Sequence, residues 1–314
     1  MSLPIVVIGS LNADLVVRLD RFPLPGETTL GHDFQRFPGG KGSNQAYAAA
    51  KLGGNVSLVG QAGSDAQSDF LVQSLAAGGV DVKHIRRHPD LPSGVAVIMV
   101  DAEGRNQIVV VPGANGAFGP DELEECRGLI AEARIVLLQL EIPSATVEAA
   151  ARMAKQCGAL VILDPAPAQE ISRKLLALVD YLTPNETELA ILTNTDVCQL
   201  NAEGAAEKAI PLLKAGVRNV LVKMGSQGAL LSGEQGLHFW PSVPVRTLDT
   251  TAAGDAFNGA FAFALASGRS VAEAGTFASA AAACSVTRAG AQPSMPTRVE
   301  VENLLRQTAS GVQA

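Results

Sequence analysis

Short apolar segments alternate along most of the chain with longer segments that have the pattern of helices. The apolar segments have the length of buried strands. The predicted strands are residues 5–9, 56–59, 95–100, 108–111, 135–140, 160–163, 181–183 and 220–222. The predicted helices are residues 43–52, 68–77, 120–131, 144–156, 169–178, 202–214, 253–266, 271–286 and 297–307. Such alternation predicts an α/β fold in which a mostly parallel sheet is covered by helices on both faces.

Two segments interrupt this alternation. Residues 15–37 show no helical pattern and contain Pro23, Pro25 and Gly26. Residues 93–112 hold two strand-like runs joined by a turn at 101–104, which predicts a hairpin. We expect the two segments to pair as a small antiparallel lid over one edge of the main sheet, within a single domain of residues 1–314. An uncovered lid exposes an apolar face, so we also expect a homodimer formed through it.

The composition excludes several other classes of protein. A formal net charge of −7 argues against a nucleic-acid partner, which would favour a basic surface. No apolar run is long enough to span a membrane, and residues 1–4 lack the pattern of a signal peptide. The four cysteines form no CxxC pair, and neither cysteines nor a carboxylate cluster accompany His84 and His88. We therefore expect a cytoplasmic protein with free thiols and surface histidines.

Residues 249–261 carry the strongest chemical signal. Small residues and Gly254 lead into a helix that is apolar on nearly all sides and is therefore expected to be buried. The free N–H groups of its first turn, around Ala252 and Ala253, form an anion site that backbone can approach closely. Asp255 lies in that turn. It is either a simple partner of the helix terminus or a general base next to a phosphoryl-binding site.

A second glycine-rich loop lies at residues 39–46, with the sequence Gly-Gly-Lys-Gly-Ser-Asn-Gln-Ala. It is a tight turn that enters a helix and presents Lys41 and Asn44 at the helix start. It is not a P-loop, because Gly42 follows Lys41 and the earlier glycine spacing is absent. Taken alone, it could be an ordinary glycine loop capped by Ser43.

Together, in this order, the two loops resemble the two signatures of the ribokinase family of sugar kinases. The resemblance implies a ribokinase-like three-layer sandwich with a small β-strand lid. It also implies ATP-dependent phosphorylation of D-ribose at O5, with Asp255 as general base and the N–H groups of residues 252–254 as anion hole. The implied catalytic residues are Asp255, Gly254, Ala253 and Ala252.

The resemblance also extends to the sugar site. The implied sugar-binding residues are Asn12, Asp14, Gly40, Lys41, Asn44, Glu141 and Asp255. Glu141 follows a predicted strand, which is where ligands bind in open α/β sheets. Asn12 favours ribose, because kinases of this kind that prefer 2-deoxyribose tend to have an apolar residue there.

The nucleotide site is implied in the same way. The nucleotide-binding residues are Asn185, Lys223, Gly225, Ser226, Gly228, Gly254 and Ser279. Glu188 is associated indirectly with Mg²⁺, and the pair Asn185 and Glu188 also fits a capping box. Lys223 either contacts a phosphate or points to solvent.

An activating K⁺ ion is implied near the anion hole. The residues of this site are Asp249, Thr251, Ser285, Arg288, Gly290 and Ser294. Turn-rich loops supply the carbonyl and carboxylate oxygens that a monovalent cation needs. The ion orders the anion hole without touching substrate, so we expect activation and no absolute requirement.

Two other functions remain open. One is a deoxyribokinase or another pentose or sugar kinase of the same family. The other is an inactive sugar-binding regulator on the same fold, since fold does not determine function. The presence of both Asp255 and Gly254 argues against the inactive protein.

Overall fold

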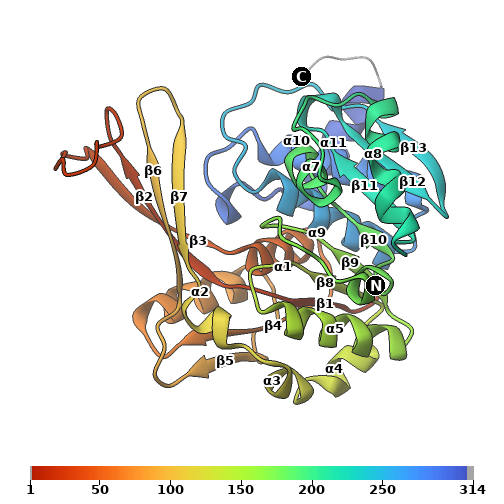
Figure 1. Ribbon diagram of the computed structural model, residues 1–314, viewed down its shortest axis with the longest axis horizontal. Coiled ribbons are helices and arrows are strands. Elements are labelled where there is room, and N and C mark those ends of the chain that lie inside the picture. Colours follow the sequence, from red (N-terminus) through yellow and green to blue (C-terminus); the bar gives the residue numbers. More distant parts are fainter. Residues whose placement is uncertain (1, 310–314) are drawn as a thin grey trace.

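The computed structural model describes residues 2–309 and contains two β-sheets (Figure 1). The larger sheet has the order β13 (Gly236–Trp240), β12 (Ala229–Gly233), β11 (Asn219–Lys223), β10 (Tyr181–Leu182), β9 (Leu160–Leu163), β8 (Ile135–Leu138), β1 (Ile5–Ile8), β4 (Val56–Gly63) and β5 (Ile85–His88). All neighbours from β11 to β5 pair in parallel. Only β12 and β13 run antiparallel to their neighbours. The predicted α/β fold with a mostly parallel sheet is confirmed.

The helices cover both faces of this sheet. Ile5 and Val7 of β1 belong to one hydrophobic cluster and Val6 and Ile8 to another, as expected for a strand buried on both sides. The first cluster includes residues of α1 (Lys41–Lys51), α2 (Ala66–Ala77), α9 (Ala253–Ala266), α10 (Val271–Ser285) and α11 (Arg298–Ala309). The second includes residues of α3 (Pro120–Glu124), α4 (Arg127–Glu132), α5 (Ser144–Gln156), α6 (Arg173–Leu176), α7 (Glu186–Thr193) and α8 (Ala202–Lys214). Across residues 2–309, no helix combines the length and the apolar character needed to cross a membrane.

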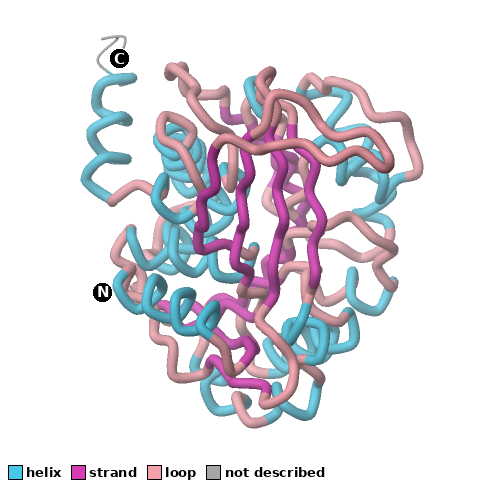
Figure 2. The backbone as a smooth tube through the Cα atoms, turned by 90° about the vertical axis from the view of Figure 1, so that its left-hand side faces the viewer, coloured by secondary structure: helices cyan, strands magenta, loops and turns pink. Residues whose placement is uncertain are grey.

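The smaller sheet stands beside the main body, and Figure 2 shows its four strands side by side. Its order is β3 (Asp33–Gly39), β2 (Asn12–Arg18), β6 (Gly94–Val100) and β7 (Asn106–Val111). The expectation of an antiparallel lid is wrong at its centre, because β2 and β6 pair in parallel. Both strands follow strands of the parallel main sheet, β1 and β5, so the chain leaves the same edge twice in the same direction. Only the outer pairs, β2 with β3 and β6 with β7, are antiparallel.

Several predicted boundaries differ from the structure. The predicted helix 120–131 is divided into α3 and α4, and the predicted helix 169–178 is reduced to the four residues of α6. Strands β5, β12 and β13 were not predicted. The β12–β13 hairpin turns at Glu234 and Gln235, a pair without the usual glycine or asparagine signal of a tight hairpin, although Gly233 and Gly236 flank it. The described residues also contain the short helices η1 (Gly113–Ala117), η2 (Gly225–Gln227) and η3 (Gln292–Ser294).

Helices α1 and α9 are in close contact at Gly259. A Cβ atom on Gly259 would lie 2.6 Å from the backbone oxygen of Gln45 and 2.8 Å from the Cβ of Ala48. Glycine therefore sets the distance between the two helices. This distance matters because α1 carries Asn44 and Gln45 and α9 carries Asp255.

We expect Gly259→Ala to lower the free energy of unfolding by about 1–3 kcal/mol, although alanine is the better helix former. The added methyl group meets backbone and a Cβ atom, which cannot rotate away. Chemical denaturation of both proteins measures the effect. Gly128→Ala in α4 is the control, because no heavy atom lies within 4 Å of the added carbon. Equal or higher stability of Gly259→Ala would contradict the contact.

Candidate active site

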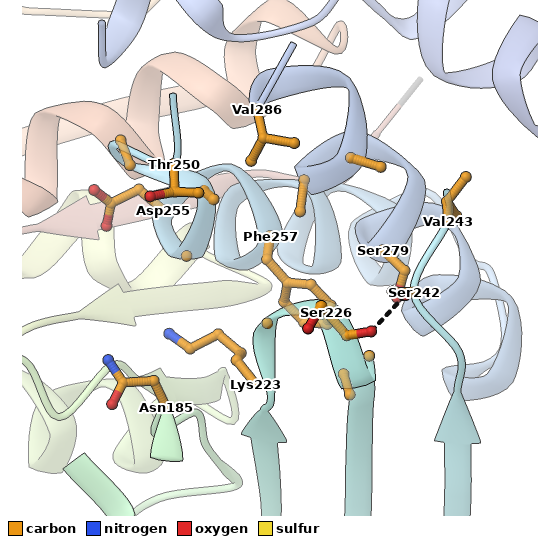
Figure 3. A pocket seen from close by; sticks show the side chains of 18 of the residues that line it. Asn185, Lys223, Ser226, Ser242, Val243, Thr250, Asp255, Phe257, Ser279 and Val286 are labelled. Atoms are coloured by element: carbon orange, nitrogen blue, oxygen red, sulfur yellow. Dashed lines mark hydrogen bonds between the residues drawn. The ribbon is translucent and has the colours of Figure 1, made fainter. Parts of the chain in front are cut away.

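The carboxyl ends of the parallel strands meet at one edge of the main sheet, where they bring polar residues together. Ser10 follows β1, Glu141 follows β8, Asp164 follows β9 and Lys223 ends β11. The strand order reverses at β1, which pairs with β4 on one side and β8 on the other. Ligands of open α/β sheets bind at such a switch point. A cavity of about 580 Å³ opens at this edge (Figure 3).

Asp255 lies in the first turn of α9 and is 5% exposed. The side-chain nitrogen atoms of Asn44 and Gln45 donate to its two carboxylate oxygens, each at 3.0 Å. Burial raises the pKa of Asp255 to about 6, against the opposite effect of the Lys41 ammonium group. The nearby charge of Asp164 adds to the increase. A carboxylate with this pKa is a better proton acceptor than an ordinary aspartate and is still ionised at neutral pH.

The N-terminus of α9 is open toward the cavity. Its N-cap, Ala252, has φ 58°, a left-handed conformation that costs an alanine about 1 kcal/mol or more. The N–H of Ala253 donates to the Thr250 carbonyl at 3.2 Å, so it is less available to bind an anion than the sequence predicted. Among the described residues, the N–H groups of Ala252 and Gly254 have no bonded acceptor. Free N–H groups at the start of a long helix favour an anion.

The predicted sugar residues gather around Glu141. Its Oε2 accepts hydrogen bonds from Ser10 Oγ, from the Lys41 N–H at 3.0 Å and from Asn12 Nδ2 at 3.3 Å. The adjoining Gly40 has φ 90°, and a Cβ there would lie 2.7 Å from the Asn12 nitrogen, so the loop requires glycine.

Two ionisable side chains that are predicted to bind the sugar have shifted pKa values. Burial raises the pKa of Asp14 to about 7, and the charges of Glu141 and Asp255 add to this. Burial lowers the pKa of Lys41, but the neighbouring carboxylates, Asp255 first, raise it above its ordinary value. Lys41 is therefore a cation held among acidic groups.

Asn115 of η1 was not predicted as a site residue. Its side chain is buried, donates to Asn12 Oδ1 and to the Leu11 carbonyl, each at 2.9 Å, and accepts from the Leu11 N–H at 2.9 Å. It therefore fixes which side of the Asn12 amide carries the nitrogen. Only its position after the second lid hairpin could have indicated this role.

Residues of β11, η2 and α10 line the part of the cavity that is predicted to bind the nucleotide. Lys223 is directed into the cavity, with its Nζ 3.0 Å from Asp164 Oδ1 and its side chain 13% exposed. Of the two alternatives for this lysine, the solvent-directed one is wrong. Figure 3 shows Lys223 between Asn185 and Asp255. The cavity also includes Gly225, Ser226, Gly228, Gly254 and Ser279.

Ser279 of α10, which is predicted to bind the nucleotide, lines this cavity. Its Oγ is buried and has no hydrogen-bond partner among the described residues, so an acceptor or donor from a ligand would satisfy it. The backbone carbonyl of Ser226, another residue of the cavity wall, accepts a hydrogen bond from Ser242 Oγ at 2.7 Å (Figure 3).

Asn185 and Glu188 form the capping box of α7. Glu188 Oε2 accepts from the Asn185 N–H at 2.8 Å, and Asn185 Oδ1 accepts from the Glu188 N–H at 2.8 Å. Both residues also line the cavity. Burial raises the pKa of Glu188, and Lys223 offsets this in part. Each Glu188 oxygen keeps a lone pair for the water of a hydrated cation, so these residues fit an indirect role with Mg²⁺.

Of the residues expected to hold a monovalent cation, Thr251 and Gly290 are hydrogen-bonded to Asp249. Its Oδ1 accepts from the Thr251 N–H and hydroxyl, and its Oδ2 accepts from the Gly290 N–H at 2.8 Å. Burial raises the pKa of Asp249, but these hydrogen bonds lower it below its ordinary value. The Arg288 side chain is 3.1 Å from Glu300, so only its backbone is available.

Two serines complete this group. Ser285 and Ser294 are buried and donate to the Ala282 and Ala291 carbonyls, each at 2.8 Å, so their oxygens keep free lone pairs. A set made of carboxylate, hydroxyl and carbonyl oxygens suits a hard cation. Among residues 2–309, no cluster of three or more His, Cys, Asp or Glu side chains suits a metal ion.

Gln45, which donates to the predicted base, and Asp164, which shares this donor, were also missed as site residues. Gln45 lies inside the first glycine-rich loop, next to the predicted Asn44. Asp164 directly follows a predicted strand, as Glu141 does, so the strand-end argument could have found it.

Comparison with known proteins agrees with this geometry. A family model described as pfkB family carbohydrate kinase matches residues 3–298. The chain is 42% identical over 301 residues to the ribokinase of Bacillus subtilis, covering 96% of this chain and 99% of that protein. It is 40% identical over 305 residues to the ribokinase of Haemophilus influenzae, covering 97% and 99%.

A solved structure agrees equally well. The Arabidopsis thaliana ribokinase complexed with ribose and ATP has a TM-score of 0.92 at 38% identity, covering 98% of this chain and 99% of that one. A deoxyribokinase from Salmonella typhi is 37% identical over 295 residues, covering 93% of this chain and 95% of that protein.

Because the folded protein raises the pKa of Asp14 from 3.8 to about 7, this carboxyl group makes stability depend on pH. The neutral Asp14 carboxyl group contributes to the free energy of unfolding. This contribution is fully present below about pH 4 and is lost as the pH rises through 7, where the buried group becomes charged. We expect Asp14→Asn to melt at a higher temperature than wild type at pH 8, with no difference at pH 4.

Thermal melting without ligands, from pH 4 to pH 8, measures this difference. Asp90→Asn, at an exposed carboxylate, is the control and should differ from wild type by the same small amount throughout. If wild type is at least as stable as Asp14→Asn at pH 8, the ionised form of Asp14 does not destabilise the folded protein.

Proposed function

Because the chain belongs to the pfkB family of carbohydrate kinases, we propose that it transfers the γ-phosphoryl group of ATP to O5 of D-ribose, giving ribose 5-phosphate and ADP. The position of Asp255 carries this proposal. It is buried in the first turn of α9 beside free N–H groups, between the cavity and the polar residues predicted to bind the sugar. The curated ribokinases and the Arabidopsis complex with ribose and ATP support it.

Asp255 acts as the general base. Its carboxylate takes the proton of the 5-hydroxyl as the oxygen attacks the γ-phosphorus, and ADP leaves. Asn44 and Gln45 hold the carboxylate in place. The N–H groups at the start of α9, with Gly254 foremost, stabilise the negative charge on the transferring group.

The sugar lies between the main sheet and the smaller sheet. Asn12, Asp14 and Glu141, with the loop at Gly40 and Lys41, bind its hydroxyl groups. A site built to bond a hydroxyl discriminates against sugars that lack it, because its own polar groups are left unpaired. Asn12 therefore favours ribose over 2-deoxyribose. The similarity to a deoxyribokinase makes 2-deoxyribose the second candidate substrate.

The nucleotide lies along β11, η2 and α10. Lys223 exchanges its contact with Asp164 for the phosphates, and Gly225, Ser226, Gly228 and Ser279 line the rest of the site. Mg²⁺, when bound, neutralises phosphate charge, and Asn185 and Glu188 orient its water shell.

K⁺ binds beside the anion hole. Asp249, Thr251, Ser285, Arg288, Gly290 and Ser294 hold it. A bound K⁺ ion would supply positive charge that orders the loop before α9, and Asp249 already ties that loop to Gly290. The effect is activation, because Thr251 and Gly290 order the loop in part without it.

The smaller sheet is a lid and a dimer interface. Four consecutive apolar side chains of its edge strand β7, from Ile108 to Val111, are 44–61% exposed. An apolar edge strand is a ready surface for a second copy of the chain. Sedimentation equilibrium of wild type and of a variant with Val109→Lys should give a dimer and a monomer, respectively.

ADP release by the purified protein tests the substrate. The assay contains Mg²⁺ and compares ribose, 2-deoxyribose, other pentoses, fructose and adenosine, each in K⁺ and in Na⁺ at equal ionic strength. We expect the highest kcat/KM with ribose, and a higher rate in K⁺. Higher kcat/KM with 2-deoxyribose would overturn the sugar assignment, and no ADP release with any of them would favour an inactive binding protein.

Replacing the base tests the mechanism. We expect Asp255→Asn to lower kcat by about 10²–10⁴-fold, while calorimetric ribose binding is retained. Asp121→Asn, which also changes a first-turn aspartate but at the exposed start of α3, should keep the wild-type rate. Near-normal turnover by Asp255→Asn would remove this residue from the role of base.

A further inference from the structure

Gln45 connects two buried carboxylates. Its side chain is fully buried, and its Nε2 donates to Asp255 Oδ1 at 3.0 Å and to Asp164 Oδ2 at 2.9 Å. An amide nitrogen has two hydrogens, so both are used. No other side chain in residues 2–309 is found to donate to both of these carboxylates.

A second buried amide determines how Gln45 is oriented. Gln139, at the end of β8, donates from Nε2 to Gln45 Oε1 at 2.8 Å. If the Gln45 amide rotated by half a turn, its oxygen would face two carboxylates and its nitrogen would face another donor. Both contacts are repulsive, so the orientation with Nε2 toward Asp255 and Asp164 is the only satisfied one.

Gln139 is itself held by close packing. A Cβ on Gly9 would lie 2.0 Å from Gln139 Oε1, so this side chain lies directly against the backbone at the end of β1. The chain of contacts therefore runs from the central strands of the main sheet, through Gln139 and Gln45, to the first turn of α9. Neither amide lines the cavity.

We propose that Gln45 is a positioning residue for the general base, and that Gln139 holds Gln45 in its working orientation. This inference rests on the role of Asp255 in the proposed function. Gln45 and Asn44 each bond one oxygen of Asp255, so together they fix the plane of its carboxylate. A base whose oxygen is fixed in advance loses less free energy when the substrate hydroxyl must be aligned with it.

Gln45 also acts on the charge of its neighbours. Hydrogen bonds to an ionised carboxylate favour the ionised form, so Gln45 lowers the pKa of Asp255 against the effect of burial. The other ionisable groups close to Asp255 are Lys41 of α1, Asp164 after β9, Asp14 of β2 and Lys223 of β11. All of them remain when Gln45 is replaced, so a shift in the pKa of Asp255 can be assigned to the lost amide.

The test is the pH profile of kcat for wild type and Gln45→Met, measured by ADP release at saturating ribose and ATP. Methionine has nearly the same length and is apolar. We expect the high-pH plateau of kcat to fall about 10–100-fold, because the carboxylate is less well oriented. We expect KM for ribose to change less than about 3-fold, and the acid limb to move to higher pH, because Asp255 holds its proton more strongly.

Gln61→Met is the matched control. Gln61 is equally buried, and its Nε2 donates to the Ala114 carbonyl at 3.1 Å, away from Asp255. The control loses a buried amide hydrogen bond and should lose similar stability, but it should keep the plateau and the acid limb of wild type.

The outcomes separate the two proposals. If wild type phosphorylates no sugar, the proposed function fails. If wild type is active and Gln45→Met keeps the wild-type plateau, or Gln61→Met shows the same loss and the same shift, the positioning role is overturned. If Gln45→Met does not fold, Gln139→Leu decides: a lowered plateau with an unchanged KM supports the role, and a wild-type plateau overturns it.

Discussion

The burial of several charges at one edge of the sheet is the constraint on which the rest of the structure depends. Asp255 and Asp164 are both nearly inaccessible to solvent, and isolated charges are costly there. The fold compensates them with Lys41, with the ion pair from Lys223 and with amide donors from α1. The part of this compensation that comes from α1 depends on its close approach to α9 at Gly259. The spacing of two helices thus determines the electrostatics of the site.

The same edge links the proposed sugar site to the smaller sheet, the proposed lid. β2 begins at Asn12, only four residues after β1 ends, so the lid strand and the sugar-binding residues share one segment. Asn115, after the last lid strand, bonds Asn12 and the backbone of Leu11. A movement of the lid would therefore reach the sugar-binding amide through covalent and hydrogen-bonded connections. The cavity that we propose for the nucleotide is lined by residues of β11 and α10, and it also reaches Asp255.

The sequence predicted the α/β fold, both glycine-rich loops and a chemically consistent group of polar residues. It did not predict the parallel pairing of β2 with β6, because that depends on the direction in which two distant segments leave the main sheet. It also did not assign Asp164, although the residue follows a strand end. The direction of Lys223 stayed open, since a lysine at a strand end can point either way until its partner is known.

The sequence by itself determined the order of strands and helices, the loops that need glycine and the kinds of side chain available for catalysis. These follow from local patterns, because periodicity and backbone conformation act over a few residues. Only the tertiary structure decided which side chains meet. Gln45 and Asp255 are 210 residues apart, and Lys223 and Asp164 are 59 apart, yet each pair is hydrogen-bonded. Hydrogen bonds and pKa values depend on distance and burial in space, and no local pattern in the chain contains either.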